Sequence, residues 1–106
     1  MMWVQVDFDE RGNKAIFRRF SAQAETIRAA VTAQLETQIS ADFSKTKLAS
    51  RHLFAGLRVY ECRVNMGKLP ALRVAFTVRG NQATVVYMST HIQKSDFSRE
   101  VDAFLK

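Results

Sequence analysis

The chain has 106 residues, of which 47% are hydrophobic and 25% charged, so it has the composition of one globular domain spanning residues 1–106 rather than of a disordered or collagen-like protein. Its single cysteine excludes an internal disulfide and a cysteine-based zinc cluster, and it favours a reducing, cytoplasmic location. The net charge of +6 indicates a polyanionic or acidic partner, either nucleic acid or protein.

The N-terminal third predicts one strand followed by helix. Residues 3–8 alternate polar and apolar side chains, which is the pattern of a strand with one apolar face. Residues 9–13 supply a turn and an acidic helix start. From Ile16 to Ile39 apolar residues recur at spacings of three and four, which predicts either one long amphipathic helix or two shorter ones, with Ser21 capping the second.

The remainder predicts three strands and a closing helix. Residues 40–50 are polar and irregular, and strands at 59–64 and 72–79 follow, joined by a loop over 65–70 that contains Gly and Pro. Gly80-Asn81 is a hairpin signal. The next strand, at 82–90, is apolar on both faces and is therefore expected at the centre of the sheet.

Ser95 or Asp96 is expected to cap the final helix, whose apolar residues Phe97 and Val101 are four apart. The order of these elements predicts an α+β fold: a small curved, mainly antiparallel sheet packed on one face against N-terminal helices, with a short C-terminal helix.

The two middle strands carry charged residues on one face. In 72–79 the even-numbered residues are apolar, while Arg73 and Arg79 lie on the other face. In 59–64, Glu61 and Arg63 share the face opposite Cys62, which is expected to be a buried thiol. We therefore expect an apolar underside and an exposed cationic surface containing one acid.

Such a surface suits metal-independent RNA cleavage, which needs a base for the ribose 2′-hydroxyl, cations beside the phosphate and an acid for the leaving oxygen. Glu61 is the candidate base, Arg63 and Arg73 are the candidate phosphate ligands, and His91 is the candidate proton donor. The alternative is that Glu61 forms ordinary cross-strand pairs with these arginines and that His91 is a plain surface residue.

Further basic residues are candidate RNA contacts, although an ordinary solvated loop explains the cluster at 45–58 equally well. Phe43, Phe54, Tyr60 and Phe76 have the spacing of core residues rather than of a base-stacking surface. The candidate RNA-binding residues are Lys45, Lys47, Arg51, Arg58, Arg79 and Lys94.

Several kinds of site are absent from the sequence. It has no Gly-rich phosphate loop, no zinc-spaced Cys and His set and no acidic cluster for magnesium, so no cofactor and no metal are expected. The longest apolar runs, such as 83–88, are far shorter than the roughly 20 residues of a membrane-spanning helix. The acidic N-terminus also differs from a signal peptide, so no membrane contact is expected.

In order and spacing, these segments resemble the RelE/ParE toxin superfamily of bacterial toxin–antitoxin modules, and most closely its RelE- and HigB-like toxins. The resemblance covers most of the chain. Its segments are VQVDFDERGNKAIFRRF, HLFAGLRVYECR, LRVAFTV, RGNQATVVYMSTHIQKS and SDFSREVDAFL, the second resembling the stretch where relatives read L-x-G-x-x-x-Y-E-x-R.

The resemblance implies a RelE-like fold, an acidic antitoxin as partner and, in the RelE-like branch, ribosome-dependent mRNA cleavage with contacts to 16S ribosomal RNA. The ParE branch inhibits DNA gyrase instead, and a non-catalytic nucleic-acid-binding module on the same fold is a third possibility. Glu61 matches the acidic residue that some RelE-like members use as the base, Arg63 matches a basic residue of the active face, and Arg73 matches the arginine of the Y-R-V strand. His91 and Lys94 fall near the last helix, where relatives carry histidine or basic residues.

One position departs from the family pattern. Several ribosome-dependent members carry a tyrosine in the closing segment, where this chain has Phe97. Phenylalanine retains the aromatic ring but has no hydroxyl, so it cannot transfer a proton.

Overall fold

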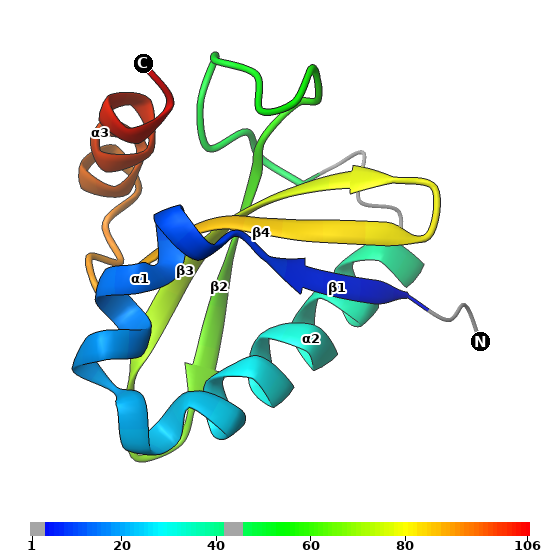
Figure 1. Cartoon of the computed structure of the whole chain (residues 1–106). Coiled ribbons are helices and arrows are strands. Elements are labelled where there is room, and N and C mark those ends of the chain that lie inside the picture. The colour runs from blue at the N-terminus through cyan, green and yellow to red at the C-terminus, as the bar shows by residue number, and fades with distance from the viewer. Residues whose placement is uncertain (1–3, 42–45) are drawn as a thin grey trace.

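The computed structural model describes residues 4–41 and 46–106, so Trp3, Phe43 and Lys45 lie outside the described residues. It confirms the α+β fold (Figure 1). No helix in the described ranges is long and apolar enough to cross a membrane. The elements in chain order are β1 (Gln5–Phe8), α1 (Glu10–Arg19), the 3₁₀ turn η1 (Ser21–Gln23), α2 (Ala24–Ser40), β2 (Tyr60–Met66), β3 (Leu69–Arg79), β4 (Gln82–Ser89) and α3 (Lys94–Leu105).

The four strands form one sheet in the order β1-β4-β3-β2. β1 pairs with β4 in parallel, because α1 and α2 carry the chain across the sheet between β1 and β2, and the other two pairings are antiparallel. β4 therefore lies between β1 and β3, which confirms the central position expected from its two apolar faces.

The main core lies between the sheet and the N-terminal helices. α2 buries Ile27, Val31 and Leu35 completely, so the predicted spacing of apolar residues is confirmed. The helical region is two helices and not one, and Ser21 begins the intervening 3₁₀ turn instead of capping α2. Asp9 caps α1 by accepting a hydrogen bond from the backbone N–H of Gly12 at 2.9 Å.

A second, smaller core lies on the opposite face of the sheet, where only an open cationic surface was expected. α3 packs Phe97 and Val101 against Ala75 of β3, and the cluster also contains Ala49 of the 46–58 segment and Val59, which precedes β2. The expectation that helices cover one face only is therefore wrong. The apolar stripe of α3 needs a surface to cover, and the small Ala75 at the centre of this face lets the helix approach.

The structure corrects two smaller expectations, on a loop and on a helix cap, and confirms a third. The predicted loop over 65–70 is a tight turn at Gly67-Lys68, where Gly67 has a φ of +64°, and Pro70 lies inside β3. α3 begins at Lys94 with Gln93 in the capping position, so neither Ser95 nor Asp96 is the cap. The hairpin at Gly80-Asn81 is confirmed.

Gly12 determines how closely α1 packs on the edge of β4. A Cβ atom at this position would lie 1.7 Å from the carbonyl oxygen of Val86, so no side chain fits without a backbone shift. We expect Gly12→Ala to lower the free energy of unfolding by about 3 kcal/mol, measured by urea denaturation.

Gly67→Ala is the matched control, because the space around Gly67 is open and only its positive φ opposes a side chain. Its expected cost is about 1 kcal/mol. Equal losses in the two variants would show that close packing at Gly12 is unimportant.

Candidate functional site

Glu61 and Arg73 form a buried ion pair between β2 and β3. Arg73 Nη1 lies 3.0 Å from Glu61 Oε1, and Arg73 Nε donates to the backbone carbonyl of Ile92 at 2.7 Å. The Glu61 side chain is only 4% exposed, and within the described residues its second oxygen has no hydrogen-bond partner. The structure therefore places the predicted base beneath the surface.

A general base must reach the proton that it removes. With its carboxylate covered and one oxygen held by Arg73, Glu61 does not reach a ribose hydroxyl at the surface in this structure. What the geometry gives Glu61 is a positioning role, since it fixes the guanidinium of Arg73 from one side while the Ile92 carbonyl fixes it from the other.

His91 takes part in a hydrogen-bonded network with the C-terminal helix. Its Nδ1 lies 2.7 Å from Glu100 Oε2, while the other Glu100 oxygen accepts hydrogen bonds from Tyr87 at 3.0 Å and Ser89 at 3.1 Å. Ser89 Oγ in turn accepts the backbone N–H of His91. The ring is therefore held by two elements, the end of β4 and α3.

This arrangement suits proton transfer. The His91 side chain is 68% exposed, and with Nδ1 on Glu100 its other nitrogen, Nε2, makes no hydrogen bond within the described residues. A carboxylate on one imidazole nitrogen sets the tautomer and leaves the other nitrogen available to a substrate. Burial, followed by the hydrogen bond and the charge of Glu100, raises the pKa of Tyr87 to about 12, so its phenol stays protonated and donates to Glu100.

His91 and Arg73 meet at the same end of the sheet. Arg73 pairs in register with Ser89, and it donates to the carbonyl of Ile92, the residue after His91. The site thus combines the exposed imidazole of His91, held by the half-buried Glu100, with the partly exposed guanidinium of Arg73, held by the buried Glu61. Sequence reasoning found His91, Arg73 and Glu61 but missed Glu100, Tyr87 and Ser89.

The other predicted residues are distributed around the molecule. Arg51 and Lys94 line one pocket of about 340 Å³ between the 46–58 segment and α3, so the structure brings these two together.

The remaining predicted residues lie apart from one another. Arg63 is exposed and donates to Asn65. Arg79 lies at the far end of β3, about 20 Å from Arg73 along the strand, and is not part of the same site. Lys47 and Arg58 are exposed and do not line the pocket that contains Arg51 and Lys94.

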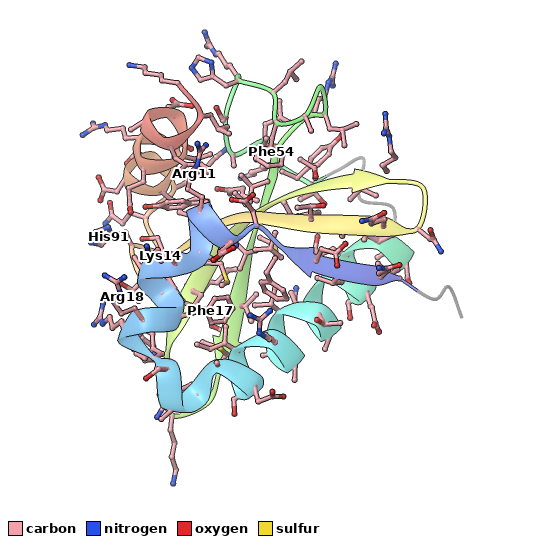
Figure 2. The ribbon with its side chains drawn as sticks, in the orientation of Figure 1. Arg11, Lys14, Phe17, Arg18, Phe54 and His91 are labelled. Carbon is pink, nitrogen blue, oxygen red and sulfur yellow. The ribbon has the colours of Figure 1, made fainter. Side chains whose placement is uncertain are left out.

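A basic face on α1 was also missed. Arg11, Lys14 and Arg18 are exposed and three or four residues apart, so they follow one side of the helix. Figure 2 shows them along α1, with His91 on the same side of the molecule. Arg19 of the same helix donates to Thr90, next to His91. The helical spacing of these basic residues was the signal available in the sequence.

Metal-binding groups are not apparent in this region. Within residues 4–41 and 46–106, no three His, Cys, Asp or Glu side chains are grouped so that they could hold a metal ion.

Cys62 is buried, as expected, on the face of the sheet that the N-terminal helices cover. Burial and the neighbouring charge of Glu61 raise its pKa from 9.0 to about 12, against a smaller opposing effect of Arg73. We expect the native thiol to resist a disulfide reagent at pH 8 and to react fully once urea unfolds the chain. Rapid labelling of the native protein would contradict this burial.

The same shift has a consequence for stability. Because the unfolded thiol ionises first, the Cys62 contribution is fully present below pH 9 and is lost as the pH rises towards 12. The raised pKa of Tyr87 gives the same pH dependence of stability: its contribution is present below pH 10.0 and is lost as the pH rises towards 12.

In comparisons with known proteins, no protein-family model, no curated protein and no solved structure matches this chain.

Proposed function

We propose that this protein is the toxin of a toxin–antitoxin module and a metal-independent endoribonuclease that cleaves mRNA on the ribosome. The observation that carries the proposal is the exposed His91, oriented by Glu100 and placed beside Arg73. The order of the strands and helices, the net charge of +6 and the resemblance to the RelE/ParE superfamily support it further. An acidic antitoxin is the corresponding protein partner.

In the proposed reaction, neutral His91 accepts the proton of the ribose 2′-hydroxyl through Nε2. The 2′-oxygen then forms a bond to phosphorus while the bond to the 5′-oxygen breaks, and the imidazolium returns its proton to that oxygen. The products carry a 2′,3′-cyclic phosphate and a 5′-hydroxyl. Arg73 stabilises the negative charge that develops on the phosphoryl oxygens.

The basic face of α1 supplies contacts to the RNA backbone in this proposal. Arg11, Lys14 and Arg18 have no carboxylate partner within the described residues, so their charges are available to phosphates. Arg11 also stacks over the ring of Phe104, which holds it between α1 and α3.

A second candidate function is binding without cleavage, as in a gyrase inhibitor of the ParE type or a nucleic-acid-binding module. The burial of two positions that align with functional residues of the family favours it. Glu61 is covered and paired, and Phe97 is fully buried between α3 and the sheet, so neither offers its side chain to a substrate.

Cell-free translation with primer extension on the mRNA tests the proposal. The protein is first washed with EDTA to remove metal ions and is then added to the translation reaction. New mRNA ends should appear within the coding sequence, and only on messages that are being translated. Inhibition of translation without new ends would refute cleavage. Cleavage of DNA by gyrase in the presence of the protein, with intact mRNA, would establish the second candidate instead.

A further inference from the structure

A pocket of about 540 Å³ opens between the end of β1, α1 and α2, and it includes neither His91 nor Arg73. Its volume falls within the roughly 300–1,000 Å³ typical of small-molecule sites. The pocket is lined by Phe8, Asp9, Glu10, Lys14, Phe17, Arg18 and Arg28.

Three cations at this pocket lack an acidic partner. Lys14, Arg18 and Arg28 are exposed, and within the described part of the chain none of them forms an ion pair. Two acids line the same pocket: Asp9 accepts the N–H of Gly12, and Glu10, within the described ranges, forms no ion pair with the cations, so the three cations exceed the two carboxylates by one charge. The pocket therefore favours an anionic occupant.

Its wall also provides a planar surface. The Arg28 guanidinium stacks 5.0 Å from the centre of the Phe8 ring and 4.4 Å from that of Phe17, and the two rings meet edge to face. The two rings hold the guanidinium plane in place while Arg28 remains exposed. A guanidinium held in this way offers a face on which a nucleobase stacks.

A planar stacking surface beside unpaired cations matches the two parts of a nucleotide. We propose that this pocket binds a nucleoside phosphate, with the base stacked on Arg28 and the phosphate held by Lys14 and Arg18. The ligand is either a free nucleotide or one nucleotide of an RNA strand, since both present the same chemistry. Figure 2 labels Lys14, Phe17 and Arg18 of α1, with Phe17 directed towards α2 and with Lys14 and Arg18 on the outer side of the helix.

The site does not require RNA cleavage. His91 and Arg73 do not line the pocket, so a protein without nuclease activity retains it, and loss of the pocket does not by itself remove the imidazole. Failure of the proposed function and failure of this proposal are therefore seen in separate measurements.

NMR titration of the ¹⁵N-labelled protein tests the proposal with four probes: adenosine monophosphate, adenosine, inorganic phosphate and a ten-nucleotide RNA. The monophosphate should shift the amide signals of Lys14, Phe17 and Arg28 and bind at least about tenfold more tightly than either half alone. Tighter binding of the mononucleotide than of the decamer identifies a free nucleotide as ligand, and the reverse identifies an RNA strand.

Arg28→Gln and Arg28→Lys should each weaken binding by about tenfold, because lysine keeps the charge but loses the plane. Arg99→Gln is the matched control, since Arg99 is an exposed arginine of α3 outside the pocket, and it should bind as the unmodified protein does. Phosphate binding as tight as that of the monophosphate, equal binding by the Arg28 variants, or no shift with any probe would each overturn the proposal.

Discussion

Replacing His91 with alanine should reduce the rate of mRNA cleavage by about 10²- to 10⁴-fold, the usual contribution of a general acid–base group. The reason is geometric. His91 is the exposed imidazole of the network, and Glu100 holds its Nδ1 so that Nε2 is the nitrogen left to accept and return the proton. Quantitative primer extension over a time course measures the rate.

The other histidine of the chain provides the control. His52 is exposed on the 46–58 segment, outside the network, so His52→Ala removes the same side chain and should leave cleavage unchanged. Glu100→Gln keeps the shape of the positioning residue without its charge and should lower kcat with little change in KM. Equal activity of His91→Ala and His52→Ala would refute His91 as the proton-transfer group.

Replacing Arg73 with alanine should destabilise the fold by about 3–5 kcal/mol, because it leaves the buried Glu61 carboxylate without its counter-charge. It also removes the donor to the Ile92 carbonyl. Urea denaturation followed by circular dichroism measures the loss. Part of any fall in activity of this variant then reflects folding, so its cleavage rate is compared only at temperatures where the variant is folded.

Two further variants separate burial from charge. Arg63→Ala removes an exposed arginine of the same sheet face and should change stability by less than about 0.5 kcal/mol. The double variant Glu61→Leu with Arg73→Met removes both charges and should recover most of the loss. If Arg73→Ala costs no more than Arg63→Ala, the ion pair contributes nothing to the fold.

Local patterns were sufficient for most of the fold. The alternation over 72–79 and the apolar run at 82–90 predicted two strands and the central place of β4, because side-chain burial repeats with the period of the backbone. The spacing of Ile27, Val31 and Leu35 predicted the buried face of α2 for the same reason. The caps were less predictable: Ser21 and Ser95 have the right side chains, but the chain turns elsewhere.

The candidate site was predictable only in part. Its strand residues, Glu61 and Arg73, were found because they share one face of adjacent strands, and the structure brings them within 3.0 Å. The partner of His91 was missed, since Glu100 lies nine positions later in the chain and reaches His91 only when α3 folds back over the sheet. No local pattern contains that contact.

The sequence by itself determined the strands, the helical regions, their order and the apolar face that packs in the main core, because these depend on periods of two and 3.6 residues within single segments. The tertiary structure decided which side chains a substrate can reach. α3 and the 46–58 segment cover the second face of the sheet, bury Glu61 and Phe97, and leave His91 exposed at the rim. Exposure depends on contacts between segments distant in the chain. Those contacts form only when the apolar side chains of α3 pack against Ala75 of β3.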